Sequence, residues 1–280
     1  MPHFAANLSM LFTEVPLAQR FERAANAGFT LVECQFPYEL PADEIKSLLD
    51  AHALTMVLHN LPAGDWAAGD RGIACDPARV DEFRSGVAQA ISYANTLGVK
   101  KINCLAGKLP AGVSEPQARQ TLINNLRYAA EQLVPHGIQL LIEPVNHFDI
   151  PGFLLDSTAK ALSVIDALTE QGEQDKPSER GERSEQDEPG ELRKHPVLLQ
   201  YDVYHAQRME GELAATLKNN LHRIGHIQIA DNPGRHEPGT GEINFPFLFD
   251  WIDQLGYAGV IGAEYKPSGT TEEGLGWMRA

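Results

Sequence analysis

The chain has 280 residues, of which 43% are hydrophobic, so it can bury the core of one large α/β domain or of two small ones. Its formal net charge of −15 argues against nucleic acids and anionic membranes as partners, because both are bound through a basic surface. A small anionic substrate remains compatible with this charge where local cations receive it.

Short β-rich runs recur along the chain with amphipathic helical segments between them. Several of these helical segments end at a glycine, as helix C-termini often do. Eight strand candidates and about eight helices in this length favour one (β/α)8 barrel over a doubly wound sheet. The strand candidates are residues 3–9, 30–36, 54–60, 100–106, 139–146, 197–205, 225–231 and 259–265.

One segment interrupts this alternation. Residues 171–194 are mostly charged or turn-forming, and Leu192 is their only sizeable apolar side chain. Such a composition cannot bury enough surface to offset the entropy of ordering. We therefore expect a single barrel domain over residues 1–280, with a solvated, mobile insertion at 171–194 on the face opposite the usual active site.

The N-terminal stretch MPHFAANLSMLF lacks the pattern of a secretory signal, and no apolar run approaches membrane-spanning length. These features predict a cytoplasmic protein without a membrane partner. Cys34, Cys75 and Cys104 fit neither a disulfide framework nor a CxxC metal spacing, so we expect reduced thiols. The sequence is compatible with a homo-oligomer.

Polar residues stand at the C-terminal ends of several strand candidates, where a barrel places its active-site mouth. They are His59 and Asn60, Glu143 and Asn146, Asp202 and His205, Gln228 and Asp231, and Glu264 and Lys266. Residues that are distant in the sequence would converge there.

Four of these residues offer oxygen ligands to a hard cation: Glu143, Asp202, Gln228 and Glu264. Three carboxylates and an amide suit Mg²⁺ or Mn²⁺ better than a metal that prefers thiolates. His205 would be either a further ligand or a neighbour that orients one.

Longer motifs resemble the hydroxypyruvate isomerase family, within the xylose-isomerase-like TIM barrels. They are FAANLSMLF, HNLPAGDWAAGDRGIAC, LLIEPVNHFDIPGF, QYDVYHAQRMEGEL, HIQIADNPGRHEPGTGEINF and GAEYKPSGTTEEGLGWM. The resemblance covers essentially the whole chain except residues 171–194. It implies that Glu143 and Glu264 are paired acid/base residues as well as metal ligands, and that Asp202 and Gln228 complete the ligand set.

The resemblance also implies a reaction, the interconversion of hydroxypyruvate and tartronate semialdehyde. One proton leaves C3 and one arrives at C2, through an enediolate. The divalent cation would stabilise the developing negative charge.

A substrate carboxylate needs a cationic partner, and Arg235 lies in the loop after the seventh strand candidate. Lys266 and Arg71 compete for this role. His59 and His205 could orient substrate hydroxyls, and Trp66 could cover the site and exclude water.

Three other readings remain open on the sequence. The nearest is an isomerase of a four-carbon 2-oxo acid, a 2-oxo-tetronate isomerase, with the same carboxylates in a longer pocket. A metal-dependent phosphodiesterase acting on abasic DNA would use the same barrel, but the acidic charge weighs against it. A non-catalytic sugar-acid sensor would bind ligand without turnover.

Overall fold

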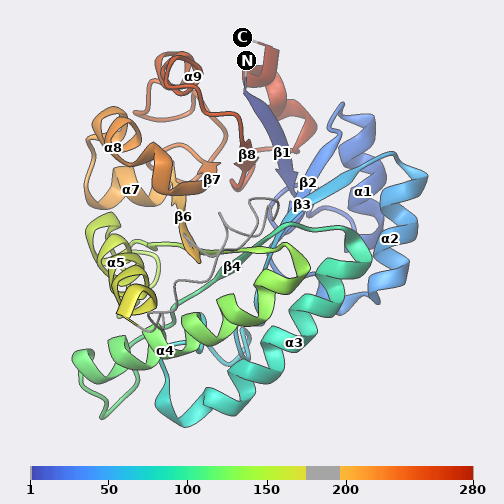
Figure 1. The fold of residues 1–280 in the computed structure, drawn as a ribbon. Helices are drawn as coiled ribbons and strands as arrows, with labels where there is room; N and C mark the ends of the chain where they lie inside the picture. The colour runs from blue at the N-terminus through green and yellow to red at the C-terminus, as the bar shows by residue number, and fades with distance from the viewer. Residues whose placement is uncertain (1, 175–195, 280) are drawn as a thin grey trace, which may run out of the picture.

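The computed structural model describes residues 2–174 and 196–279. Within them, eight parallel strands close into a barrel in chain order, with β1 paired to both β2 and β8, which confirms the predicted fold class. Figure 1 shows the helices arranged around these strands. The strands are β1 His3–Asn7, β2 Leu31–Cys34, β3 Thr55–Asn60, β4 Lys101–Cys104, β5 Gln139–Ile142, β6 Val197–Asp202, β7 Ile224–Ile229 and β8 Val260–Ala263.

The helices that follow the strands bury one apolar face each against the barrel. In α1, for example, Leu17, Phe21 and Ala24 are buried, which is the spacing of one helical face. The α-helices are α1 Leu17–Asn26, α2 Ala42–Ala51, α3 Val80–Leu97, α4 Glu115–Leu133, α5 Thr158–Gln174, α7 Val203–Met209, α8 Leu213–Asn220 and α9 Phe245–Gln254, and a 3₁₀ segment spans Glu272–Arg279. None of the helices in the described residues is long and apolar enough to cross a bilayer.

The sixth strand ends earlier than its apolar pattern predicts. The strand predicted over 197–205 stops at Asp202, and α7 begins at Val203. The reason is local, because the Asp202 side chain accepts a hydrogen bond from the backbone N–H of Tyr204 at 2.8 Å and so caps the new helix. Tyr204 and His205 therefore lie on the first turn of a helix rather than on a strand.

Part of the predicted insertion lies within the described residues. Helix α5 continues to Gln174, so the first four residues of the predicted insertion are helical. Glutamine and glutamate are good helix formers, so a helix anchored by Ala161, Val164 and Leu168 can continue through them. The rest of the insertion lies outside the described residues.

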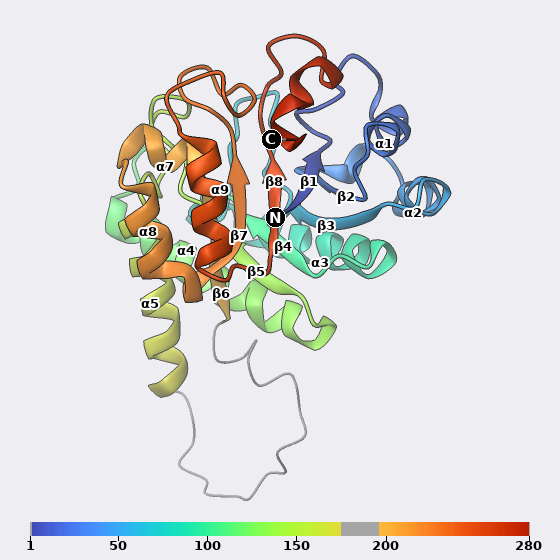
Figure 2. The same cartoon turned by 90° about the horizontal axis from the view of Figure 1, so that it is seen from above.

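The carboxyl ends of the strands define one end of the barrel. In Figure 2 the arrowheads of β1, β7 and β8 point toward the top, where the loops that follow the strands gather, and α5 ends at the opposite side. Parallel strands present their C-terminal residues at the same end, so polar side chains from separate strands meet there.

Candidate active site

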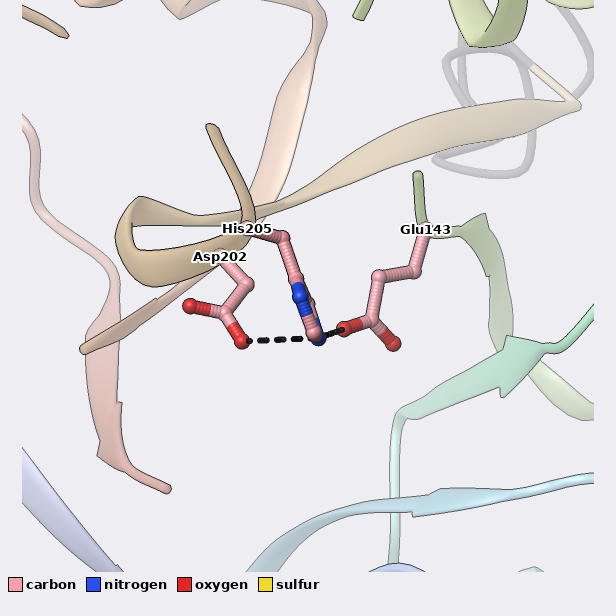
Figure 3. A group of neighbouring side chains, drawn as sticks. All are labelled: Glu143, Asp202 and His205. Carbon is pink, nitrogen blue, oxygen red and sulfur yellow. Dashed lines mark ion pairs between the residues drawn. The ribbon is translucent and has the colours of Figure 1, made fainter. Parts of the chain in front are cut away.

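A buried cluster of three potential metal ligands lies at this end of the barrel. Glu143, Asp202 and His205 place one ligand atom each within 4.8 Å of the others, and all three side chains are buried. His205 Nε2 lies 3.5 Å from Asp202 Oδ2 and 3.8 Å from Glu143 Oε1, between the two carboxylates (Figure 3). Carboxylates and imidazole are suitable ligands for a divalent cation.

The local sequence explains how these groups come to face one another. Glu143 follows the last residue of β5, and Pro144, which lacks an N–H, directly follows it. Asp202 closes β6 and caps α7, and His205 stands three residues later on the first turn of that helix. The cap geometry thus turns Asp202 and His205 toward the same point.

An ion pair between Glu264 and Arg235 completes the site. Glu264 follows β8, and its Oε2 accepts a hydrogen bond from Arg235 Nη2 at 2.6 Å. The same nitrogen lies 3.4 Å from Asp202 Oδ2, so one guanidinium bridges Asp202 and Glu264. Arg235 has a left-handed backbone, with φ of 57°, and its carbonyl oxygen accepts from Lys266 N at 2.7 Å. The loop after β7 is therefore held against the residues that follow β8.

Gln228 lies deeper in the barrel, on β7. The strand register pairs it with Asp202 on β6 and with Gly262 on β8. Its Oε1 accepts a hydrogen bond from Gln200 Nε2 at 2.7 Å, and Gln200 also donates to Glu143 Oε2 at 2.9 Å. A carbonyl oxygen keeps a second lone pair, so Gln228 can still serve as a ligand.

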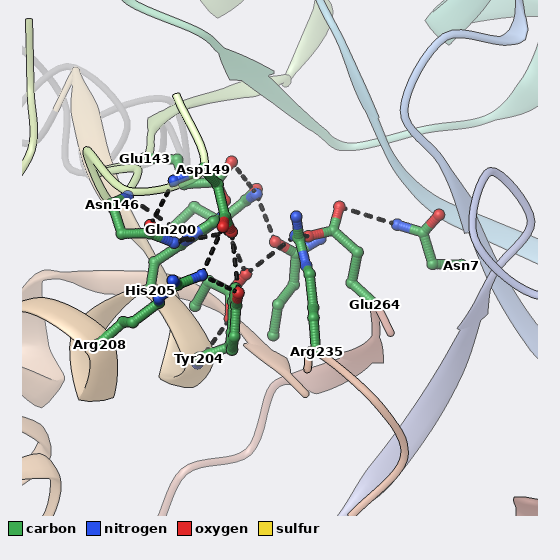
Figure 4. Close-up of polar contacts among 12 residues, drawn as sticks. Asn7, Glu143, Asn146, Asp149, Gln200, Tyr204, His205, Arg208, Arg235 and Glu264 are labelled. Carbon is green, nitrogen blue, oxygen red and sulfur yellow. Dashed lines mark hydrogen bonds and ion pairs between the residues drawn. The ribbon is translucent and has the colours of Figure 1, made fainter. Parts of the chain in front are cut away.

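The hydrogen bonds around His205 fix its tautomer. Asn146 accepts from Asp149 N with its Oδ1 and donates to Asp149 Oδ2 with its Nδ2, which sets the direction of its amide. The same Nδ2 lies 2.6 Å from His205 Nδ1, which must accept (Figure 4). The ring proton of neutral His205 is therefore on Nε2, directed at Asp202 and Glu143.

Crowding of acidic groups in a buried site changes their ionisation. Burial, together with the charges of Glu264 and Asp202, raises the pKa of Glu143 well above its usual value. Burial raises the pKa of Glu264 to about 8, although Arg235 opposes the change. Burial likewise raises the pKa of Asp202, against the effect of Arg235.

The same environment shifts the pKa of the Arg235 guanidinium and the pKa of the His205 imidazole. Burial disfavours the charged guanidinium, but Glu264, Asp202 and Glu143 outweigh it and raise the pKa of Arg235. Burial and the two nearby arginines hold the pKa of His205 well below its usual value, so its ring is neutral. Three buried carboxyl groups, those of Glu143, Asp202 and Glu264, lie near the Arg235 guanidinium and form a donor set that fits a divalent cation.

The remaining predicted site residues belong to β3, the loop after it, and the segment that follows β8. His59 is fully buried at the end of β3, and its Nε2 makes no hydrogen bond within residues 2–174 and 196–279. Trp66 is 42% exposed, and the Arg71 guanidinium lies 4.0 Å above its ring, so these two side chains pair in the loop after β3. Lys266 is exposed.

Sequence reasoning missed a set of polar side chains in the barrel wall that contact the predicted residues or, for His226, contact Glu33. Each interrupts an apolar strand or directly follows one, and this interruption was the available signal, because a buried polar group needs a partner. They are Asn7, Glu33, Gln35, Asn103, Gln200 and His226.

Comparison with known proteins identifies the family. Residues 21–172 and 190–280 match the family model described as xylose isomerase-like TIM barrel. The chain is 53% identical to the hydroxypyruvate isomerase of Escherichia coli (strain K12) over 278 residues, which are 99% of this chain and 98% of the relative. The chain belongs to the hydroxypyruvate isomerase family of xylose isomerase-like TIM barrels. The family predicted from the sequence motifs is thereby confirmed.

Two further matches cover this hydroxypyruvate isomerase family member from end to end. It is 40% identical to the 2-oxo-tetronate isomerase of Cupriavidus necator, over 100% of this chain and 98% of the relative. A solved structure described as AP endonuclease, family 2, from Brucella melitensis superposes with a TM-score of 0.88 at 40% identity, covering 100% of this chain and 98% of that one. The family model leaves residues 173–189 unmatched, within the stretch predicted as an insertion.

Proposed function

We propose that this enzyme interconverts hydroxypyruvate and tartronate semialdehyde by proton transfer through an enediolate. The observation that carries the proposal is the pair of buried glutamates in one site, Glu143 after β5 and Glu264 after β8. They are joined through His205, Asp202 and Arg235. The 53% identity to the E. coli hydroxypyruvate isomerase supports the choice of substrate.

A divalent cation, Mg²⁺ or Mn²⁺, would be held by Glu143, Asp202, Gln228 and Glu264, with His205 as a neighbour, because one of its ring nitrogens carries the proton and the other accepts from Asn146. When bound, such a cation polarises a carbonyl and stabilises negative charge on oxygen. The oxygen-rich donor set favours these two ions over metals that prefer thiolates.

The two glutamates carry the protons. The carboxylate of one removes a proton from C3 of hydroxypyruvate, and the carboxylic acid of the other delivers a proton to C2. The hydroxyl proton passes from the C3 oxygen to the C2 oxygen of the enediolate, so that C3 becomes the aldehyde and C2 the alcohol. A raised pKa suits both roles, because such a group is a stronger base when ionised and holds a proton closer to neutral pH when it is not. The pKa values of Glu143 and Glu264 are both raised, which supports these two roles.

Arg235 receives the substrate carboxylate in this proposal. Its Nη2 contacts Glu264, while its buried Nε makes no hydrogen bond within the described residues and can donate to a ligand. His59 Nε2, which is also buried without a partner in the described part of the chain, would contact a substrate hydroxyl or carbonyl. Trp66, paired with Arg71, would limit the access of water.

Arg235→Lys should raise the KM for hydroxypyruvate by at least about tenfold, because lysine keeps the charge but loses the planar fork that binds a carboxylate through two hydrogen bonds. Steady-state kinetics at saturating cation measure this effect. Arg223→Lys is the matched control, since Arg223 has a similarly exposed side chain, 21% against 22%, but pairs with Asp166 on α5. Unchanged kinetics in Arg235→Lys would transfer the role to Lys266 or Arg71.

Hydroxypyruvate should be preferred over a four-carbon 2-oxo-tetronate by about tenfold or more in kcat/KM, the usual effect of one extra carbon in a fitted pocket. The measurement is turnover of both acids with Mg²⁺ and with Mn²⁺, followed by proton NMR in deuterated water. The reverse preference would establish the alternative represented by the 40% identical relative. Binding without hydrogen exchange would indicate a sensor rather than an enzyme.

A further inference from the structure

A carboxylate lies inside the barrel wall below the site, at Glu33 on β2. Its side chain is fully buried, within the sequence Leu-Val-Glu-Cys. Three side chains donate to it: His226 Nε2 to Oε2 at 2.7 Å, and Asn7 Nδ2 at 2.9 Å and Gln228 Nε2 at 2.7 Å to Oε1. Gly262 leaves room for this group, because a Cβ there would lie 2.4 Å from both Glu33 carboxylate oxygens.

Stability alone does not explain this arrangement. Removing a carboxylate from water costs several kcal/mol, and a well-packed apolar replacement for a buried ion pair is often as stable or more so. We therefore looked for an explanation in the other hydrogen bonds that the partners of Glu33 make.

Two hydrogen-bonded arms lead from Glu33 to the two glutamates of the site. In one arm, Asn7 Nδ2 donates to Glu33 and also to Glu264 Oε1, at 3.2 Å. In the other, Gln228 donates to Glu33 and accepts from Gln200 Nε2 at 2.7 Å, and Gln200 donates to Glu143 Oε2 at 2.9 Å. Glu33 thus lies at the junction between Glu143 and Glu264.

The chemistry of the junction sets the direction of both amides. A carboxylate only accepts hydrogen bonds, so Asn7 and Gln228 must both turn their NH₂ groups toward Glu33. The orientation of Asn7 is also fixed from the other side, because its Oδ1 accepts from Ser9 N at 3.0 Å. For Gln228 the consequence is that its carbonyl oxygen faces away from Glu33, toward Gln200 and the carboxylates above.

We propose that Glu33 is a positioning residue: by accepting from Gln228 and Asn7, it turns the Gln228 carbonyl toward the cation site and holds Glu264 in place. This inference rests on the proposed function, because it assigns Gln228 to the cation. Glu33 itself touches neither substrate nor cation.

Two variants test this role by different routes. Glu33→Leu/His226→Leu removes both partners of the buried Glu33–His226 hydrogen bond together, so that neither polar group is left buried without the other. Gly262→Ala keeps the carboxylate but displaces it, and only the end of a flexible side chain has to move. In both variants Gln228 loses the acceptor that sets its direction.

The expected result is Mn²⁺ binding weakened by about 10–100-fold in isothermal titration, the usual effect of losing a group that orients a ligand. At saturating Mn²⁺ the kcat should stay at least about tenfold low, with little change in the KM for hydroxypyruvate. Thermal unfolding should remain cooperative. Asn125→Leu is the control: it removes another buried amide, which donates to the Ala74 carbonyl at 2.9 Å, and should lower the melting temperature while leaving Mn²⁺ affinity unchanged.

Wild-type Mn²⁺ affinity in either folded Glu33-directed variant would overturn the inference and leave the proposed function standing. If the double variant does not fold, Gly262→Ala decides alone. A wild-type protein that turns over hydroxypyruvate without any affinity for Mn²⁺ or Mg²⁺ would instead overturn the proposed cation site, and the inference with it.

Discussion

Glu143→Gln should lower turnover of hydroxypyruvate by about 10²–10⁴-fold, the usual worth of a general acid or base. The variant is well matched to its surroundings. Asn103 and Gln200 both donate to Oε2, at 2.9 Å each, so a glutamine can place its carbonyl oxygen there. Its NH₂ group then occupies the position of Oε1, beside the protonated Nε2 of His205. Folding should survive, but the basic carboxylate is lost and cation binding should weaken, because an amide NH₂ group is not a cation ligand.

Glu264→Gln should give a loss of the same size and, in addition, weaker cation binding. Asn7 donates to Oε1 and Arg235 donates to Oε2, so a glutamine has to turn its NH₂ group toward one of these donors. Both single variants should therefore lose turnover and bind the cation more weakly.

The measurement for this pair is kcat together with exchange of the C3 hydrogen in deuterated water, on protein shown to hold its cation. Glu115→Gln, at an exposed position on α4, is the control and should be indistinguishable from the wild type. Near-normal isomerisation in either cation-loaded site variant would rule out a mechanism that needs two carboxylates.

Removal of the divalent cation by a chelator should abolish turnover, and Mg²⁺ or Mn²⁺ should restore it. At the residue level, Asp202→Asn should remove cation binding at concentrations that saturate the wild type. Asparagine caps helices as well as aspartate does, so α7 should remain in place and the loss can be assigned to the missing charge.

Asp76→Asn provides the matched control for the cation experiment. Asp76 accepts from the backbone N–H two residues later, at 2.9 Å, just as Asp202 does at 2.8 Å, but it begins the 3₁₀ segment Pro77–Arg79. It should bind cation like the wild type. Full turnover by a verified metal-free protein, or wild-type affinity in Asp202→Asn, would contradict the proposed role of the cation.

The barrel could be predicted from the sequence because alternation of strands and helices is a local pattern. The same pattern located Glu143, Asp202 and Glu264, since the carboxyl ends of parallel strands meet at one end of the fold. The motifs that resemble the family supported the same residues. These features need no knowledge of which strand neighbours which.

Other features depend on three-dimensional register and could not be predicted. The bridge that Arg235 makes between Asp202 and Glu264 joins loops from different parts of the barrel. The junction at Glu33 requires His226 to face it across 193 residues of sequence. The early end of β6 was missed for a different reason, because the apolar pattern continued through Val203 while the Asp202 cap decided the helix start.

Closure of the barrel has a consequence for how this protein is made. Glu264 follows β8, which pairs with β1 at the other end of the chain, from His3↔Val260 to Ala6↔Ala263. A ribosome-bound chain that still lacks β8 therefore cannot assemble the site. A ligand that recognises only the closed form adds its binding free energy to the stability of that form. A cation at this site would thus stabilise the protein at the final step of folding. Cation capture would report that β8 of a newly synthesised chain has paired with β1.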